Sequence, residues 1–238
     1  MSKRDNESII SPIPRDKQAA RGWIVKLNDE PVHDVRILEI THPAFGFVKY
    51  GMTLGGYDSW AFCDSGGSVI LPFSWFEGQL VVGVIYQKRV NQGGYVWNSV
   101  RGFVDQGEDR GFGSVREFME ETGYRGDARN VIELPGVWAN PNSTFFDTSD
   151  GTNGVSFYSV EIDATELVRI GGRLVLQSNL IDESSEAIEL RASEGIRSMA
   201  FIPWSEAAIL ADMFTNAAVA RLIAYIDTSE EQVVVPRI

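Results

Sequence analysis

The stretch Arg101–Tyr124, RGFVDQGEDRGFGSVREFMEETGY, decides how this chain folds. Its second half is expected to form one short helix. Asp109 stands where a helix can start, and Gly123 can take the left-handed conformation that ends one. A helix with a defined start and end is therefore predicted here, between a glycine-rich loop and Tyr124.

This helix is predicted to have one packing face and one acidic face. At about 100° per residue, one narrow stripe holds Val115, Phe118, Met119 and Thr122. The three glutamates Glu117, Glu120 and Glu121 are expected on the opposite side, where they repel one another. Arg116 relieves only part of that repulsion. Hard oxygen ligands on a rigid scaffold suit Mg²⁺ or Mn²⁺.

A solvated acidic helix face is the alternative interpretation of these glutamates. The spacing of the whole stretch favours a functional site. Seven residues stand at the spacing G-x5-E-x7-R-E-U-x-E-E-x-G-U, where U is bulky and apolar: Gly102, Glu108, Arg116, Glu117, Glu120, Glu121 and Gly123. Phe118 and Tyr124 fill U positions. This pattern resembles the Nudix box, and the chain is similar to Nudix hydrolases.

The resemblance implies hydrolysis of a nucleoside diphosphate linked to another moiety, by attack of water on one phosphorus. It implies Mg²⁺ as the cofactor, with Mn²⁺ as a substitute. Glu117 and Glu121 would be the principal metal ligands, completed by the backbone carbonyl of Arg101. Glu120 would be a further ligand or a solvated residue next to the site.

Four residues of the motif have structural roles by the same resemblance. Glu108 would pair with Arg116 and hold the loop onto the helix. Gly102 and Gly123 would bound the loop and the helix. These assignments predict that the motif folds as one unit.

The general base is expected on an acidic segment near the C-terminus, NLIDESSEAIELRASEG. In the branch of ADP-ribose pyrophosphatase-like enzymes, a glutamate in this region does this work. The candidates are Asp182, Glu183 and Glu186, and an acidic surface loop is the alternative. A base here must come within hydrogen-bond reach of the attacking water.

Arg89 and Pro141 are the predicted substrate contacts. Arg89 ends a Gln-Lys-Arg triplet that matches the Q-x-R of this branch, and an arginine can grip a phosphate with two prongs. Pro141 lies near the place where the branch carries a proline. The branch usually has Glu-Leu-Pro-Ala-Gly at the start of the box, whereas this chain has Asn98–Gly102. That difference leaves the substrate open among nucleoside diphosphate derivatives.

Composition restricts the classes of partner. The chain has 238 residues, 44% of them hydrophobic, which is ample for a core. Its net charge is −12, and it has no lysine or arginine cluster of the kind that follows a phosphate backbone, so long nucleic acid is not an expected partner. A small nucleotide remains possible, with metal ions between the charges.

The number of cysteines and the hydropathy of the chain indicate the cellular compartment. The single cysteine, Cys63, excludes an internal disulfide and is expected to be a packing residue. No signal-peptide core is recognisable, and no segment reaches the roughly 20 apolar residues of a membrane span. The protein is expected in the cytoplasm, without a membrane partner.

Three parts are expected along the chain. Residues 1–20 are predicted to be a mobile segment, and residues 21–65 a small antiparallel β meander that also mediates a homodimer. Residues 66–238 would form the Nudix domain.

Several strands and helices are expected in this domain. Strands are predicted over 68–76, 79–89, 95–100, 130–139, 155–162, 188–190 and 199–204, with a turn at Glu77-Gly78. A helix is predicted over 205–226, with a break near Thr215-Asn216. The fold class is therefore α/β, a Nudix-type α/β/α sandwich with a mixed sheet after the N-terminal meander.

Two other functions are alternatives to hydrolysis of a nucleoside diphosphate derivative. A non-catalytic nucleotide sensor with the same fold is disfavoured because every box carboxylate is present. A nucleoside triphosphate pyrophosphohydrolase would usually be smaller and would lack the N-terminal meander.

Overall fold

A computed structural model describes most of the C-terminal two thirds of the chain and the strands of the N-terminal part. The described residues are 10–11, 25–27, 30–32, 38–42, 46–53, 58–63, 67–89, 93–104, 107–128, 130–136 and 155–233. The chain divides into two compact units, Met1–Ser65 with Asn140–Asn153, and Gly66–Ala139 with Gly154–Ile238.

The first unit contains short antiparallel strands. They are β1 (Ile10–Ser11), β2 (Val25–Leu27), β3 (Glu30–Val32), β4 (Leu38–His42), β5 (Gly46–Thr53) and β6 (Asp58–Cys63). β5 pairs with β4, β6 and β1, while β2 and β3 form a separate pair. Ile10 and Ser11 lie in the segment 1–20, whose mobility stays a prediction. The domain boundaries and the dimer role of residues 21–65 remain predictions.

The second unit is built on one large sheet. Its strands are β7 (Gly67–Phe76), β8 (Gln79–Arg89), β9 (Gly94–Asn98), β10 (Val100–Phe103), β11 (Val131–Glu133), β12 (Val155–Glu161), β13 (Leu167–Ile170), β14 (Arg173–Leu176) and β15 (Ile196–Pro203). Its helices are α2 (Arg110–Thr122), α3 (Ser185–Ser193), α4 (Trp204–Ala207) and α5 (Met213–Val233). The sheet runs in the order β11-β12-β7-β8-β15-β14-β13.

The sheet is mixed and divides at its centre. β12 pairs in parallel with β7, and the other pairs in this sheet are antiparallel. β7 and β8 pair only next to their shared turn, where Glu77 and Gly78 have φ of 52° and 78°. Farther on, β10 pairs with β7 and β9 pairs with β8. The two strands before the motif helix therefore occupy the gap where β7 and β8 diverge.

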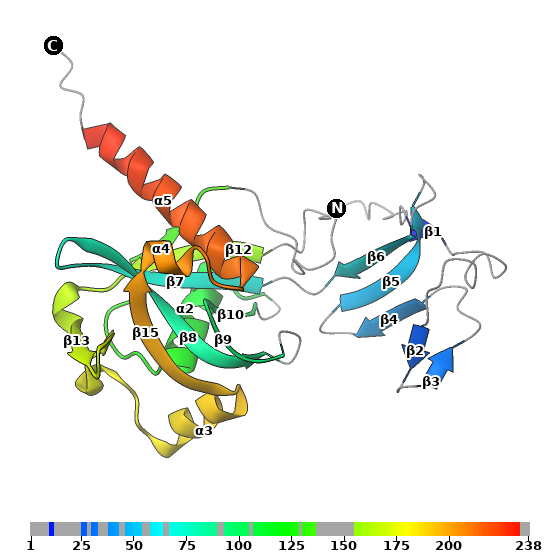
Figure 1. Cartoon of the computed structure of the whole chain (residues 1–238), viewed down its shortest axis with the longest axis horizontal. Helices are drawn as coiled ribbons and strands as arrows, with labels where there is room; N and C mark the ends of the chain where they lie inside the picture. The colour runs from blue at the N-terminus through cyan, green and yellow to red at the C-terminus, as the bar shows by residue number, and fades with distance from the viewer. Residues whose placement is uncertain are drawn as a thin grey trace, which may run out of the picture. The chain divides into compact units, whose positions relative to one another are not determined.

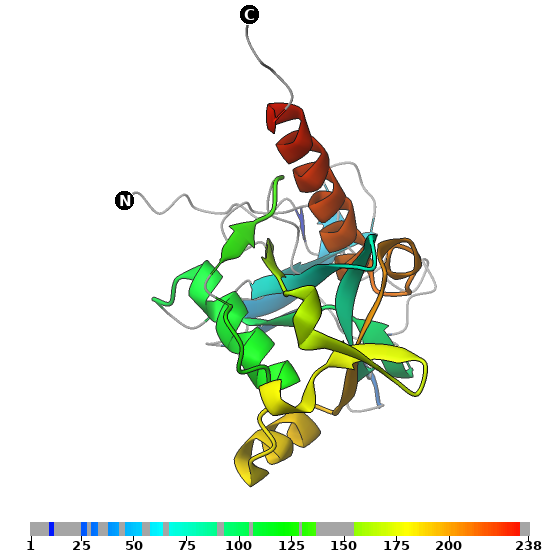
Figure 2. The same cartoon turned by 90° about the vertical axis from the view of Figure 1, so that its left-hand side faces the viewer.

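Helices cover both faces of this sheet, as Figures 1 and 2 show. Under α2, the core contains Ile70, Ile85, Phe118, Tyr124 and Phe201, among others. On the other face, α4 and α5 pack onto a second core that includes Val69, Leu71, Phe157, Phe214 and Leu222. Alternate residues of β7 enter the two cores, as expected for a strand buried on both faces. The expected α/β/α sandwich with a mixed sheet is confirmed.

Residues 188–190 are helical, so the strand predicted there is wrong. They lie in α3, whose N-cap is Ser184; Oγ of Ser184 accepts a hydrogen bond from the backbone N of Ala187. Three residues with one apolar alternation gave too little pattern to outweigh this cap and the helix-forming Glu, Ala and Leu that follow it.

The last helical stretch is divided in two as predicted, but the break lies at 208–212 and not near Thr215-Asn216. Asp212 caps α5 by accepting from the backbone N of Thr215 at 2.9 Å. Nδ2 of Asn216 donates to the carbonyls of Ala207, Ala208 and Leu210, which lie at the end of α4 and just beyond it. Asn216 therefore closes the break from inside the next helix.

Two further details differ from the sequence prediction. The strand expected over 95–100 is two strands, β9 and β10, divided at Ser99. The hairpin β13-β14 was not predicted, although Gly171 and Gly172, with φ of 57° and 81°, form its turn. Among the described residues, no helix is both long enough and apolar enough to span a membrane.

Candidate active site

Helix α2 is fixed at both ends by the residues that the sequence indicated. Oδ1 of Asp109 accepts from the backbone N of Gly111 at 2.9 Å and of Phe112 at 3.1 Å. Gly123 has φ of 74°, and its N–H donates to the carbonyl of Met119. The predicted start and end of the helix are confirmed.

The face that α2 turns to the sheet differs from the predicted one. Its buried residues are Gly113, Ser114, Phe118, Glu121 and Thr122. Met119, expected to pack, is 40% exposed, whereas Glu121, expected on the solvated side, is 3% exposed. The face is centred on Phe118, and Glu121 lies about 60° from it while Met119 lies about 100° away. One motif carboxylate is therefore part of the interior.

The carboxylate of Glu117 lies directly against the main chain of Gly102. A Cβ atom added to Gly102 would be 1.9 Å from Cδ of Glu117. Any other residue at this position would push the carboxylate away, which gives the first glycine of the motif a physical reason. Burial raises the pKa of Glu117, and the neighbouring Arg116 partly opposes this rise.

Arg116 forms hydrogen bonds with carboxylates of the loop and of helix α2. Its guanidinium donates to both oxygens of Glu108, at 3.1 and 3.2 Å. It also donates to Glu117 at 2.8 Å, to Glu120 at 3.0 Å and to the carbonyl of Phe103 at 3.2 Å. The bond to Glu108 contributes most to raising the pKa of Arg116. The structure thus contains the pairing of Glu108 and Arg116 that the motif suggested.

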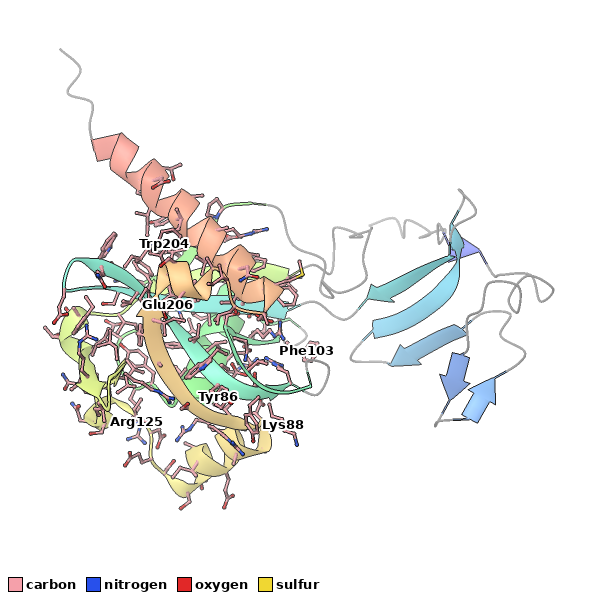
Figure 3. All side chains as sticks on the ribbon, viewed as in Figure 1. Tyr86, Lys88, Phe103, Arg125, Trp204 and Glu206 are labelled. Atoms are coloured by element: carbon pink, nitrogen blue, oxygen red, sulfur yellow. The ribbon has the colours of Figure 1, made fainter. Side chains whose placement is uncertain are left out.

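Glu121 is held at both carboxylate oxygens. Oε1 is 3.4 Å from Nε2 of Gln87, and Oε2 accepts from the backbone N of Arg101 at 3.2 Å. Burial raises the pKa of Glu121 to about 8; the charge of Arg89 opposes this rise and that of Glu117 adds to it. Gln87 is 3% exposed and also donates to the carbonyl of Glu194. Its neighbours Tyr86 and Lys88, labelled in Figure 3, alternate with it along β8.

Arg89 of β8 lies near this carboxylate with its charge, whereas Arg101 of β10 contacts it through its backbone N. Arg89 donates from Nη2 to Oδ1 of Asn98 at 3.1 Å, while its Nε is buried and has no hydrogen-bond partner in the part of the chain that the structure describes. Burial, and next the charge of Arg101, lower the pKa of Arg89 to about 10. The side chain of Arg101 pairs with Asp212 at 3.3 Å. It therefore turns toward α5.

The acidic segment near the C-terminus brings a different glutamate to the site. Glu183 and Glu186 are exposed, and Asp182 forms an ion pair with Arg125 that lowers the pKa of Asp182. In contrast, the charge of Glu194 acts on Glu117 and on Glu121, raising the pKa of each. Sequence reasoning did not single out Glu194, although it lies in the same acidic stretch. Pro141 lies outside the described residues.

Two cavities lie near α2, and the smaller one is next to these carboxylates. A cavity of about 220 Å³ opens beside Glu121, with Arg191, Arg197 and Ser198 also in its lining. A larger cavity, of about 750 Å³, lies along Phe112 and Met119 on the outer side of α2, and none of the motif glutamates lines it. The chemistry of the side chains, rather than volume, identifies the smaller one as the neighbour of the candidate site.

The donor set suits a divalent cation chemically. Glu117, Glu120 and Glu121 offer the hard oxygens that Mg²⁺ prefers. After burial, the charges of Glu120 and Glu194 add to the raised pKa of Glu117, and those of Glu117 and Glu194 add to the raised pKa of Glu121. Within the described ranges, however, no three acidic, histidine or cysteine side chains already converge as a metal site. Arg116 bonds Glu117 and Glu120, and Glu121 turns inward, so a cation would have to draw these carboxylates together.

Comparisons with known proteins gave matches among solved structures only. No protein-family model and no curated protein matches the sequence. A Nudix hydrolase from M. smegmatis, RenU, is 15% identical, with 75% of this chain and 94% of that chain covered and a TM-score of 0.46. The Ap4A hydrolase of C. elegans is 11% identical, with 69% and 98% covered and a TM-score of 0.43.

A third similar structure is the Nudix domain of Shewanella oneidensis NrtR, complexed with ADP ribose. It is 14% identical, with 71% of this chain and 87% of that chain covered and a TM-score of 0.40. At such identities and TM-scores, the case for a function rests on the residues of the site.

Proposed function

We propose that this protein is a Mg²⁺-dependent Nudix pyrophosphohydrolase. Its substrate is a nucleoside diphosphate linked to another moiety, ADP-ribose or another nucleotide sugar, and its products are a nucleoside monophosphate and a phosphorylated compound. The observation that carries the proposal is the pair Glu117 and Glu121, two half-buried or buried carboxylates of one helix held against the strand that precedes the motif loop.

A structural protein gains little from this arrangement. Burying a carboxylate is costly unless it is paired, and the raised pKa of Glu117 and of Glu121 reflects that cost. An acidic surface helix would have turned its glutamates to water. Retaining two carboxylates where they repel each other and Glu194 favours a site for cations.

Glu117 and Glu121 would hold the divalent ions, with Glu120 and the carbonyl of Arg101 as further ligands. Bound divalent ions supply charge neutralisation of the diphosphate and a lower pKa for the attacking water. The protein orients these ligands. Gly102 makes room for Glu117, while Gln87 and the backbone N of Arg101 fix the two oxygens of Glu121.

Arg89 is proposed to hold a phosphate of the substrate. Its Nε has no hydrogen-bond partner among the described residues and can donate to an anion, and Asn98 holds the guanidinium at Nη2. Asn98 is fully buried, and its Nδ2 lies 3.5 Å from the carbonyl of Ile85 and 3.4 Å from that of Val96. With its amide committed in this way, Asn98 does not replace the glutamate that the ADP-ribose branch usually has there. The sugar moiety is therefore left open.

The water is proposed to lose its proton to a carboxylate of the acidic segment. Asp182, Glu183 and Glu186 are the candidates from the sequence, and of these Asp182 is paired with Arg125. Glu194 joins them because Gln87 contacts both Glu121 and the carbonyl of Glu194, and because the charge of Glu194 raises the pKa of Glu117 and of Glu121. Segment 182–195 would carry the base, and α3 would set its reach.

Product identification tests the proposed function. The protein is incubated with Mg²⁺ and, separately, with ADP-ribose, other nucleotide sugars, NADH, dinucleoside polyphosphates and dNTPs, and products are identified by mass. AMP with a sugar phosphate supports the proposal. A dNMP with pyrophosphate would instead indicate a triphosphate pyrophosphohydrolase. Tight nucleotide binding without any hydrolysis would indicate a sensor.

A further inference from the structure

Asp212 lies between α4 and α5 and is 2% exposed, and both of its carboxylate oxygens are used. Oδ1 is 3.3 Å from Nη1 of Arg101. Oδ2 accepts from the backbone N of Thr215 at 2.9 Å and from its Oγ1 at 2.7 Å. One carboxylate thus joins the first turn of α5 to an arginine of β10.

A second bond closes this connection into a ring. The backbone N of Ser99 donates to Oγ1 of Thr215 at 2.7 Å, and both residues are fully buried. The guanidinium of Arg101 also lies 4.9 Å from the ring centroid of Phe214. Residues 99–101 are therefore attached to the start of α5 through a side chain and through the main chain.

The same short segment contacts the motif helix on the other face of the sheet. The backbone N of Arg101 donates to Oε2 of Glu121 at 3.2 Å, while the side chain of Arg101 pairs with Asp212. A shift of Arg101 along or across the sheet would move the donor that Glu121 accepts. Residues 99–101 therefore connect the start of α5 to a carboxylate of α2.

Capping α5 does not require this second contact. Asp163 caps the turn η3 (Ala164–Glu166) in the same way, accepting from the backbone N and from Oγ1 of Thr165. For Asp163, the contacts in the described part of the chain are those of a cap alone. Asp212 commits its other oxygen to Arg101, whose charge lies close enough to lower the pKa of Arg89. The charge of Asp212 opposes the effect of Arg101 on the pKa of Arg89.

We propose that Asp212 is a positioning residue that acts on Glu121 through Arg101. It fixes the place where the N–H of Arg101 meets the Glu121 carboxylate, and so the pose in which Glu121 receives a divalent cation. The effect on cation binding rests on the proposed function, whereas the effect on the Arg101 amide rests on the geometry alone.

The test compares Asp212→Asn, Arg101→Met, the double variant and the control Asp163→Asn. Asparagine keeps an oxygen for Thr215, so the fold is expected to survive. In Asp212→Asn, the Arg101 amide is expected to exchange its hydrogen faster by NMR. Mn²⁺ affinity, measured by electron paramagnetic resonance without substrate, and kcat are each expected to fall about tenfold, with KM nearly unchanged.

The double variant separates positioning from stability. If Asp212 acts through Arg101, the double variant loses no more than either single variant, because the two residues serve one contact. Asp163→Asn is expected to lower the melting temperature at most. A merely structural Asp212 would behave like this control, with unchanged Arg101 exchange, Mn²⁺ affinity and kcat, and that result would overturn the proposal.

Two outcomes keep the proposals distinguishable. If Asp212→Asn does not fold, Arg101→Met is used instead, because it leaves the cap on Thr215 intact. Unchanged hydrogen exchange of the residue 101 amide and unchanged Mn²⁺ affinity in this variant would then refute the proposal. If the wild-type protein hydrolyses nothing, the proposed function fails. The exchange rates still decide whether Asp212 positions Arg101.

Discussion

Glu121 is the most deeply buried of the charged motif residues that the structure describes. It is 3% exposed, yet the proposed function requires its ionised form. Replacing it by glutamine keeps the shape and removes the charge. We expect Glu121→Gln to lower turnover about a hundredfold or more, with the fold retained, since a neutral amide suits a buried position better than a carboxylate.

The measurement is kcat on the best nucleotide substrate, with circular dichroism as the control for folding. Glu120→Gln is the comparison from the same helix, because Glu120 is 42% exposed and should matter less. Near-normal turnover in Glu121→Gln would mean that the site is misplaced.

The pKa of Glu121 predicts how stability depends on pH. Its folded-state pKa of about 8 is above the 4.5 of an unperturbed glutamate, so ionisation opposes folding. Protonated Glu121 therefore contributes to the free energy of unfolding. This contribution is fully present below pH 4.5 and is lost as the pH rises through about 8. The melting temperature of the metal-free protein should therefore fall over this range, and fall less in Glu121→Gln. Equal pH slopes in the two proteins would contradict the burial argument.

At the residue scale, sequence spacing identified the motif but not its orientation. Asp109, Gly123, Glu108 and Arg116 do what their positions in the motif suggest. Whether Glu121 or Met119 faced the sheet could not be read from residue type, because apolar preference places Met119 inside. The contacts of Gln87 and Arg101 that accommodate Glu121 come from distant strands.

The loop and helix of the motif are joined by Arg116. A lysine offers one point charge and cannot reach Glu108, Glu117 and the carbonyl of Phe103 together. We expect Arg116→Lys to destabilise the protein by about 1 kcal/mol or more, because a part-buried, two-pronged pair is lost.

Chemical denaturation measures this difference. Arg169→Lys is the matched control, because its pair with Glu77 is exposed on both sides, at 56% and 68%, and should contribute almost nothing. Equal losses in the two variants would show that Arg116 does not hold the motif together.

The segment around α3 decides which glutamate can serve as base. We expect Glu194→Gln to reduce kcat more than Glu183→Gln or Glu186→Gln, because only Glu194 of these three acts on the charges of Glu117 and Glu121. The three variants are compared in kcat at saturating substrate across pH. A larger loss in Glu183→Gln or Glu186→Gln would favour the sequence-based candidates.

At the element scale, long patterned segments were predictable and short ones were not. β8 has the predicted bounds, and β7 and β12 differ by a single residue at one end. Residues 188–190 had too few alternations to define a strand. The break before α5 depends on the side chains of Asp212 and Asn216, whose partners lie several residues away.

At the scale of the whole molecule, the layering followed from the order of elements. Strands interspersed with a few helices predicted a sheet covered on both faces, and the two cores have that arrangement. The division of the sheet between β7 and β8 was not predictable, because it depends on which strand ends pair over long separations. That division places β10, and with it Arg101, beside α2.

A homodimer remains our prediction for the assembled protein. The N-terminal strands offer edges that a second copy can cover. We expect light scattering at micromolar concentration to give twice the mass of one chain. A monomeric mass under these conditions would refute the prediction without affecting the proposed chemistry.

The most direct measurement is anomalous diffraction from crystals soaked with Mn²⁺ and a nucleotide product. We predict a manganese peak within coordination distance of the Glu117 and Glu121 carboxylates, and its loss in Glu121→Gln. Manganese bound elsewhere, with no peak between these two side chains, would contradict the proposed metal site.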